Sequence, residues 1–331
     1  MKAICVTPDR ELAVRDIPTP NTPAPGHVLI DMDACAINHG DKAFLRMPTV
    51  AGNALSLGQY DVWGASGAGR VVAVGAGVPV GYTGKQVAVY RSLDRSPESV
   101  GLWCERAHVP YTTCLILPDH VHTRDYCGSL VNVMTAYAFL EEISNAGHNG
   151  VIVTAGNSAT GHALASLARS RNIPAIFLVR TAAARDALSR WGVEHVIVAT
   201  EGFTDALGVL STELGATAVF DGVGGDLLTS IAPSLPMNST IYCYGFLGGA
   251  APVSIQSVLV MMKNLRMKRF SNFESRTVKE QAKLVAALKT LEGVIDDPMF
   301  MTQIGKEFRR DQIELAMAYE SADGSKAVVV T

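Results

Sequence analysis

The stretch VIVTAGNSATGHALASLAR, Val151 to Arg169, decides the fold of the second half of this chain. It begins as an apolar, β-branched strand and continues as a helix. The turn between them is built of small residues and contains two glycines, Gly156 and Gly161. A strand, a tight turn and a helix N-terminus together direct backbone N–H groups and the helix dipole at an anion. The turn is therefore a candidate phosphate site, and an ordinary strand-to-helix connection is the alternative.

The same alternation continues beyond this stretch. A helical pattern over 123–146 comes first, and the segments VIVTAG, AIFLVR, HVIVA, ATAVFDGV and STIYCYGF are each followed by a helical segment. Parallel strands need a helical crossover, so this alternation predicts parallel β-α-β units. The strands are apolar on both faces, which is typical of a sheet covered by helices on both sides. The sequence predicts an α/β fold with a doubly wound parallel sheet.

The first ~120 residues have a different character. Their short apolar strands are broken by Gly and Pro, which predicts an irregular β barrel or sandwich. With 331 residues, the chain is expected to contain two domains. The tail has two helical segments, SRTVKEQAKLVAALKTLEG and RDQIELAMAYES, and ends in the strand KAVVVT. We expect the tail to pack back on the first domain.

Composition excludes several classes of protein. Lys and Arg number 28 against 31 Asp and Glu, and the net charge of −3 gives no indication of a nucleic-acid partner. The 6 cysteines are scattered without a C-x-x-C pair, which is typical of reduced thiols in a cytoplasmic protein. The N-terminal apolar run is quickly broken by Pro and charged residues, so we expect no signal peptide. We also expect no transmembrane helix and no membrane partner.

Two arginines follow the second predicted strand. Arg180 ends the segment AIFLVR, at the position where an acidic residue would bind the ribose 2′-hydroxyl of NAD. Arginine at this position, with Arg185 following, favours the 2′-phosphate of NADPH, because a guanidinium can bind phosphate through two parallel hydrogen bonds. A solvated strand end and a solvated helix face are the alternatives for these two residues.

Several motifs occur in a fixed order along nearly the whole chain: INHGD, GAGRVVAVGAGV, GLWCERAHV, VNVMTAY, AGNSATG, VFDGVGG, YGFLGG and GSKAVVVT. In their order and spacing the chain resembles the medium-chain dehydrogenase/reductase superfamily, in the zinc-independent branch of quinone oxidoreductases and 2-enoyl thioester reductases. The resemblance implies a GroES-like β-barrel domain over 1–122, completed by 272–331, and a Rossmann NADPH-binding domain over 123–271. NADPH and a small-molecule substrate would lie in the cleft between them.

The resemblance also implies that there is no metal site. The family's first zinc cysteine falls at Asn38, and its His-Glu pair falls at Ala65 and Ser66. Cys104 and His108 have a ligand-like spacing but no further partners, and we expect a buried thiol and a surface imidazole. Without zinc, oxidation of an unactivated alcohol is hard, whereas a quinone or a conjugated carbonyl accepts hydride from NADPH more easily. The oxygen that gathers charge then needs hydrogen-bond donors.

The remaining site residues follow from the same resemblance. Tyr60 and Trp103 are the candidate catalytic residues: the phenol nearest the cleft loop, and an indole that shapes the acyl site. An exposed turn and core packing are the respective alternatives. The expected cofactor-binding residues are Asn38, Asn132, Thr135, Asn157, Ser158, Ala159, Thr160, Gly161, Arg180, Arg185, Gly222, Val223, Tyr244, Gly245, Phe246, Phe270 and Ser271.

One departure from the family bears on the substrate. The enoyl thioester reductases place a tyrosine some eleven residues beyond the asparagine that Asn38 matches, and this chain has Met47, Pro48 and Thr49 in that region. Tyr60 follows only after an apparent insertion, and we expect the segment Thr49–Tyr60 to form a rim or lid. A quinone reductase does not need that tyrosine.

The sequence therefore predicts an NADPH-dependent, zinc-free oxidoreductase that transfers hydride to a quinone or an α,β-unsaturated carbonyl compound. Two alternatives stay open: a trans-2-enoyl-CoA or acyl-carrier thioester reductase, and a noncatalytic NADPH-binding relative. The resemblance also implies a homodimer or homotetramer, joined through the edge of the Rossmann sheet. The apolar segment Ser254–Phe270 is the expected contact.

Overall fold

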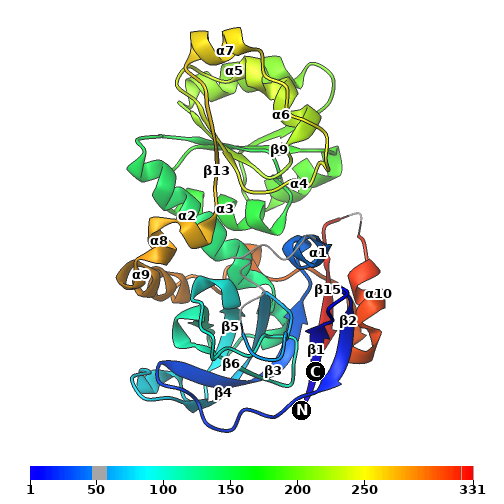
Figure 1. Cartoon of the computed structure of the whole chain (residues 1–331). Coiled ribbons are helices and arrows are strands. Elements are labelled where there is room, and N and C mark those ends of the chain that lie inside the picture. Colours follow the sequence, from blue (N-terminus) through cyan, green and yellow to red (C-terminus); the bar gives the residue numbers. More distant parts are fainter. Residues whose placement is uncertain (47–57, 322, 331) are drawn as a thin grey trace. The chain divides into compact units, whose positions relative to one another are not determined.

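The computed structural model describes residues 1–46, 58–321 and 323–330 (Figure 1). Residues 49–57 of the predicted rim or lid, with Met47 and Pro48, therefore lie outside the described part. By its contacts the chain divides into unit 1, Met1–Asn132 with Glu280–Thr331, and unit 2, Val133–Lys279. Both boundaries fall further along the chain than the predicted ones, and the division into two functional domains stays a prediction.

Unit 2 is built on a six-stranded parallel sheet with the order β10-β9-β8-β11-β12-β13. Numbered along the chain, this order is 3-2-1-4-5-6, the order of a doubly wound dinucleotide-binding sheet. The predicted α/β fold is therefore confirmed. The strands are β8 (Val151–Val153), β9 (Ala175–Val179), β10 (His195–Val198), β11 (Ala218–Asp221), β12 (Thr240–Cys243) and β13 (Arg266–Arg269).

Helices connect these strands and cover the sheet. Apolar residues on the central strands, such as Ile152, Val219 and Ile241, are fully buried. Burial on both faces explains why these strands read as continuous apolar runs. The helices are α2 (Ser129–Asn145), α3 (Ala159–Ser170), α4 (Ala182–Arg190), α5 (Phe203–Glu213), α6 (Gly225–Ile231), α7 (Ser257–Lys263) and α8 (Arg276–Lys279).

The edge strand β13 is the element of this sheet that the sequence did not predict. Its residues Arg266–Arg269, RMKR, are all exposed, so the strand lacks the apolar run that marks its neighbours. It is nevertheless paired in parallel with β12. Charged side chains are usual on an edge strand, because they discourage uncontrolled pairing with other chains.

Unit 1 contains a seven-stranded sheet of order β14-β15-β3-β4-β5-β7, with β6 paired to β3, and a separate β1-β2 hairpin. These strands bear out the β-rich character predicted for the first part of the chain. The strands are β1 (Lys2–Val6), β2 (Leu12–Asp16), β3 (His27–Ala36), β4 (Ser66–Val74), β5 (Gln86–Tyr90), β6 (Arg106–Pro110), β7 (Cys114–Ile116), β14 (Ile304–Arg309) and β15 (Lys326–Val330).

The helices of unit 1 are few and short. Within the described residues of the whole chain, no helix combines the length and the apolar character needed to cross a membrane. The α-helices of unit 1 are α1 (His39–Arg46), α9 (Gln281–Glu292) and α10 (Ile313–Ala318). The short 3-10 helices of both units are Val80–Tyr82, Arg91–Leu93, Tyr111–Thr113, Thr123–Tyr126, Ala232–Ser234, Asn272–Glu274, Pro298–Phe300 and Arg310–Gln312.

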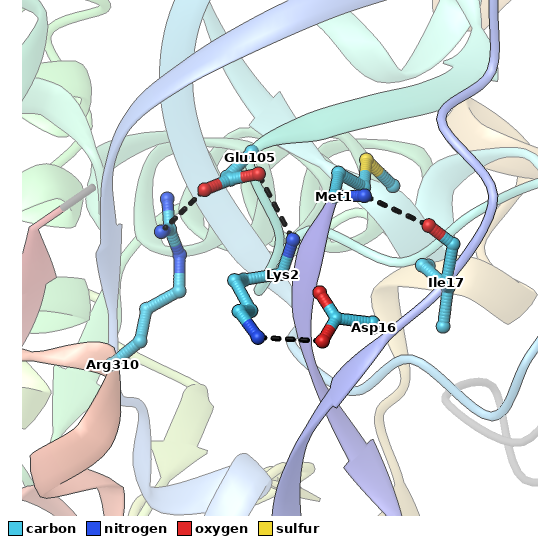
Figure 2. Close-up of polar contacts among 6 residues, drawn as sticks. All are labelled: Met1, Lys2, Asp16, Ile17, Glu105 and Arg310. Carbon is cyan, nitrogen blue, oxygen red and sulfur yellow. Dashed lines mark hydrogen bonds and ion pairs between the residues drawn. The ribbon is translucent and has the colours of Figure 1, made fainter.

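The tail returns to unit 1 and completes its sheet. Strand β15 pairs in antiparallel fashion with β3, and its residues Val328 and Val329 are buried. Polar contacts also hold the N-terminal hairpin (Figure 2). Glu105 accepts a hydrogen bond from the Lys2 backbone N–H at 2.9 Å and another from Arg310 Nη1 at 3.4 Å. The ion pair between Lys2 and Asp16 in the same view is well exposed and contributes little, about 0–1 kcal/mol.

An aromatic stack lies at the carboxyl end of β11. Phe220 is fully buried, and its ring lies between Phe139 of α2, with 4.0 Å between ring centroids, and Tyr244, with 3.8 Å. Offset-stacked rings contribute beyond the apolar area that they bury. This stack therefore supports the loops that follow β11 and β12.

Replacement of Phe220 tests the stack. Phe220→Ala is expected to lower the free energy of unfolding by about 3–5 kcal/mol, because it opens a cavity in a closed core. Phe246→Ala is the matched control: Phe246 is 45% exposed. Its loss should cost about 1 kcal/mol or less. Chemical denaturation followed by circular dichroism measures both, and equal losses would contradict the assignment.

Candidate functional site

The predicted cofactor residues of unit 2 follow the carboxyl ends of its strands. Because the strands are parallel, the segments after these ends lie along one edge of the sheet. The strand order reverses between β8 and β11, which is where doubly wound sheets form a ligand crevice. The residues brought to this edge are Asn157–Gly161 after β8, Arg180 after β9, Gly222 and Val223 after β11, Tyr244–Phe246 after β12, and Phe270 and Ser271 after β13.

The turn after β8 is packed tightly. Ser158 caps α3, and its Oγ accepts a hydrogen bond from the Gly161 N–H at 3.0 Å. A Cβ at Gly161 would lie 2.3 Å from the carbonyl oxygen of Gly156, so only glycine lets the helix start this close to the turn. A Cβ at Gly156 would in turn lie 2.8 Å from the carbonyl oxygen of Leu178. Both glycines therefore hold positions at which backbone meets backbone.

A buried carboxylate joins the two strands at the reversal point. Asp221 Oδ1 accepts from Thr154 Oγ1 at 2.7 Å, and Thr154 Oγ1 accepts from the Gly222 N–H at 3.0 Å. Asp221 Oδ1 also accepts hydrogen bonds from the N–H groups of Val223 and Gly224, at 3.3 and 3.2 Å. Sequence reasoning noted the motif VFDGVGG but assigned no role to Asp221 or Thr154. The hydrogen bonds fix the loop that contains Gly222 and Val223.

The loops after β11 and β12 are bonded to one another. The N–H groups of Leu247 and Gly248 each donate at 2.9 Å, to the carbonyl oxygens of Gly222 and Val223. The Tyr244 hydroxyl lies against the Gly222 backbone, where a Cβ would come within 2.6 Å of it. Phe246 is 45% exposed. The ring of Phe270 is instead buried in the aromatic core, so only its backbone could contact a cofactor.

Three buried polar atoms at this edge lack hydrogen-bond partners among the described residues. They are Asp221 Oδ2, Tyr244 Oη and Ser271 Oγ, which lie at or just past the ends of β11, β12 and β13. An unpaired buried polar group costs about 1–3 kcal/mol, so a native structure normally satisfies it with a ligand or water. Burial raises the pKa of Tyr244 well above its usual range, although the neighbouring Ser158 side chain opposes the shift, so the hydroxyl keeps its proton and can donate. These atoms and the glycine turn suit a nucleotide.

The two predicted arginines differ in their surroundings. Arg180 is exposed directly after β9, and its guanidinium makes no hydrogen bond or ion pair with another described residue. Arg185 donates from Nε and Nη2 to Asp186 Oδ1, at 3.0 and 2.9 Å. The Arg180 side chain is therefore the better placed of the two to meet a phosphate.

The first predicted site residue of unit 1 lies in a buried polar cluster. Asn38 Nδ2 donates to Ser66 Oγ at 2.8 Å and to Asp41 Oδ2 at 3.1 Å, while Asn38 Oδ1 accepts from Lys326 Nζ. Asp41 Oδ1 also accepts from the Ala65 N–H at 2.9 Å. Ala65 and Ser66 are the positions at which the resemblance places the family's His-Glu pair. A direct hydrogen bond joins Asn38 to Ser66, and Asp41 links Asn38 to Ala65.

Burial shifts the pKa values of both charged members of this cluster. It raises the pKa of Asp41, although hydrogen bonds from Asn38 and Ala65 oppose the shift. It lowers the pKa of Lys326 to about 8, although the Asp41 charge opposes that shift. Sequence reasoning missed Asp41 and Lys326, because their proximity depends on β15 returning to β3.

The two candidate catalytic residues lie in unlike places. Tyr60 is 45% exposed in a turn with φ 61°, without a hydrogen bond to another described residue. Trp103 is 1% exposed and lies over Gly64, where a Cβ would come within 2.2 Å of Trp103 Cδ1. The indole thus takes the core-packing position named as its alternative, although its Nε1 has no partner among the described residues.

Other predicted side chains already have partners. Asn132 Nδ2 donates to the Gly128 carbonyl at 2.7 Å, and Thr135 Oγ1 accepts from Asn272 Nδ2 at 2.9 Å. Cys104 is a buried thiol, as expected. The expectation of a surface imidazole at His108 was wrong: this ring is 6% exposed and bonds to the Glu98 carbonyl and the Ala24 N–H, because β6 pairs with the central strand β3.

Comparisons with known proteins agree with this architecture. Residues 24–138 match the family described as the alcohol dehydrogenase GroES-like domain. The chain is 30% identical over 214 residues to the human (Homo sapiens) synaptic vesicle membrane protein VAT-1 homolog, a match that covers 62% of this chain and 50% of that protein. A probable quinone oxidoreductase of Schizosaccharomyces pombe is 27% identical over 188 residues, covering 56% and 55%. The chain thus spans about half the length of these relatives.

Two further relatives extend the comparison. The mitochondrial enoyl-[acyl-carrier-protein] reductase of Bos taurus is 26% identical over 251 residues, covering 74% of this chain and 64% of that protein. A mycobacterial protein solved in complex with NADPH matches with a TM-score of 0.75 at 23% identity, over 100% of both chains. The fold and the turn after β8 define the class of two-unit proteins with a dinucleotide-type sheet and a GroES-like unit. These similarities indicate the medium-chain dehydrogenase/reductase superfamily, in the branch of the quinone oxidoreductases.

The close packing of the turn can be tested by one added methyl group. Gly161→Ala is expected to lower the free energy of unfolding by about 1–3 kcal/mol, because the new Cβ meets backbone that cannot move aside. Gly81→Ala is the matched control, since a Cβ there meets nothing within 4 Å. It should leave stability unchanged or raise it by up to about 1 kcal/mol. Wild-type stability of Gly161→Ala in thermal or urea unfolding would refute the packing.

Proposed function

We propose that this protein is an NADPH-dependent, zinc-free reductase that transfers hydride to a quinone or an α,β-unsaturated carbonyl compound. The observation that carries the proposal is the edge of the unit 2 sheet. There a glycine-lined turn occurs together with buried polar atoms and an Arg180 guanidinium that have no hydrogen-bond partner among the described residues. The NADPH complex of the mycobacterial relative and the names of the yeast and bovine relatives support the same chemistry.

Each end of NADPH has candidate partners in this chain. The turn Asn157–Gly161, with Gly222 and Val223, would hold the diphosphate, and Arg180 the 2′-phosphate. Asn38 would serve the nicotinamide ribose, as the family resemblance implies, and Asn132, Thr135, Tyr244–Phe246, Phe270 and Ser271 would complete the cofactor contacts. NADPH supplies the hydride to an electrophilic carbon, and a proton from solvent or a side chain completes the reduction.

The zinc-free character is proposed from the chemistry of the donors. Zinc binds thiolate, imidazole and carboxylate ligands. At the family's metal position this chain has the amide of Asn38, the methyl group of Ala65 and the hydroxyl of Ser66. The Asn38 amide and the Ser66 hydroxyl are already hydrogen-bonded to each other. Asp41 is also engaged, since it accepts from Asn38 and Ala65.

A second candidate acceptor is a trans-2-enoyl thioester of CoA or an acyl carrier. The similarity to the bovine enoyl-[acyl-carrier-protein] reductase favours it. The chemistry is the same, because hydride adds to the carbon β to the carbonyl and a proton adds to the α carbon. Tyr60 would then be the candidate proton donor and Trp103 would shape the acyl site.

We also propose a homodimer or homotetramer in the cytoplasm. The exposed face of α7 carries Val258, Met261 and Met262, and Met267 is exposed on the neighbouring edge strand β13. An apolar patch beside a free sheet edge is typical of a contact between subunits. Each of the 6 cysteines is a free thiol, which supports a reducing compartment.

Parallel assays of acceptors test the proposed activity. NADPH oxidation is followed at 340 nm with an ortho-quinone, a simple enone and a trans-2-enoyl-CoA. We expect the quinone or the enone to be reduced faster than the thioester. Faster reduction of the thioester would move the assignment to the enoyl thioester reductases. NADPH binding without oxidation by any acceptor would reject catalysis and leave a noncatalytic relative.

Arg180 decides the choice between NADPH and NADH. Arg180→Ala should weaken NADPH binding by about tenfold to a hundredfold, because a hydrogen-bonded contact to a charged group is worth about 1.5–3 kcal/mol. NADH, which lacks the 2′-phosphate, should bind nearly as before. Arg190→Ala, at the far end of α4, is the matched control and should change neither affinity. Equal losses for both cofactors in a fluorescence titration would exclude Arg180 as the phosphate ligand.

A further inference from the structure

Lys326 and Asp41 meet through the side chain of Asn38. Lys326 begins β15, Asp41 lies in the first turn of α1, and Asn38 follows β3. The lysine donates to Asn38 Oδ1, and Asn38 Nδ2 donates to Asp41 Oδ2 at 3.1 Å. One amide thus bridges a cation and an anion, with its carbonyl end toward the cation and its NH₂ end toward the anion. In the reverse orientation the NH₂ group would face the ammonium and the carbonyl oxygen would face the carboxylate. The two charges therefore allow a single orientation of the amide.

This bridge determines which hydrogen bonds Asn38 can still make. A side-chain amide has two N–H donors and an oxygen with two lone pairs. The two donors are used by Asp41 Oδ2 and Ser66 Oγ, at 3.1 and 2.8 Å. Lys326 uses one lone pair of Oδ1. Toward a ligand, Asn38 can therefore act only as an acceptor, through the second lone pair of Oδ1.

Lys326 also compensates a buried charge. Asp41 is fully buried, and its hydrogen-bond donors are neutral backbone and amide N–H groups. A buried carboxylate without a counter-charge would be protonated, because desolvation disfavours its ionised form. The ammonium of Lys326 is the cation whose charge opposes this effect. The cluster thus contains one negative and one positive charge, with no net charge, and the Asn38 amide lies between them.

We propose that Lys326 is a positioning residue for cofactor binding: its ammonium fixes the Asn38 amide as a hydrogen-bond acceptor for a hydroxyl of the nicotinamide ribose. This assignment rests on the proposed binding of NADPH. In this proposal the lysine acts through Asn38. Removal of Lys326 should therefore not weaken NADPH binding further once the Asn38 amide has been removed.

The charge state of Lys326 gives the proposal a pH dependence. The titratable groups that face Lys326 are Asp41 of α1 and Cys127, just before α2, and burial raises the pKa of the Cys127 thiol to about 12, so it stays neutral. Burial lowers the pKa of Lys326 to about 8, so the ammonium is present below this pH and is lost above it. The affinity for NADPH should therefore fall as the pH rises through about 8.

The first test is a set of variants with NADPH affinity as the readout, measured by fluorescence titration at pH 7. Asn38→Ala and Lys326→Met should each weaken binding by about three- to tenfold, the worth of one hydrogen bond. The double variant should be no weaker than Asn38→Ala alone. Lys326→Arg should restore most of the affinity and remove the pH dependence, because arginine stays protonated. Lys306→Met, an exposed lysine on β14, is the matched control and should bind as wild type.

Two results would overturn the proposal. One is a double variant whose loss of NADPH affinity equals the product of the losses in Asn38→Ala and Lys326→Met. Independent contacts give such a product, whereas a residue that acts through Asn38 adds no loss once the amide is removed. The other is wild-type affinity of Lys326→Met from pH 6 to 9. If Lys326→Met does not fold, Asp41→Asn/Lys326→Met, which leaves no unpaired buried charge, takes its place and is compared with Asp41→Asn.

A second measurement separates this proposal from the proposed function. The side-chain amide resonances of Asn38, identified by their loss in Asn38→Asp, are followed by ¹⁵N NMR between pH 6 and 9.5 without cofactor. They should shift with a midpoint near the lysine pKa in the wild type and stay constant in Lys326→Met. Constant resonances in both proteins would refute the link between the lysine and the amide. Failure of the wild type to bind NADPH would instead refute the proposed function.

Discussion

The hydrogen bond between Thr154 and Asp221 is the constraint on which the candidate site depends. It joins the ends of β8 and β11, the two strands at which the order of the sheet reverses. The same carboxylate holds the backbone of Val223 and Gly224, and that loop in turn bonds the loop after β12. Two loops from separate parts of the sequence thus acquire fixed positions at one edge of the sheet. The other oxygen of Asp221 is buried and has no hydrogen-bond partner among the described residues.

In unit 1 a buried pair of opposite charges holds polar groups at the ends of strands. Its central strand β3 ends beside Asn38, and the returning strand β15 brings Lys326 to the same place. A buried carboxylate and an ammonium are costly to bury singly and acceptable as a pair with hydrogen bonds. Here the amide between them gains a fixed orientation. Both units therefore use a buried carboxylate to hold polar groups at the ends of strands.

The sequence was sufficient for the fold, and it supplied candidates for part of the site. Continuous apolar runs and helical periods identified the parallel sheet, because a sheet covered on both sides leaves that pattern. The polar edge strand β13 leaves no such pattern and was missed. The turn residues and Arg180 could be proposed as site residues because they directly follow strands. Asp41 and Lys326 were missed because the hydrogen bond that brings Lys326 to Asn38 joins residues 288 positions apart, and the local sequence around them does not indicate it.

The most direct test of the account is transfer of hydride from the cofactor to carbon. The protein would be incubated with an enone and NADPH that carries two deuterium atoms at C4 of the nicotinamide, and the product analysed by mass spectrometry. The account predicts a saturated ketone with one deuterium at the β carbon. A product without deuterium, or cofactor that binds and is never oxidised, would contradict the assignment of this protein as a reductase.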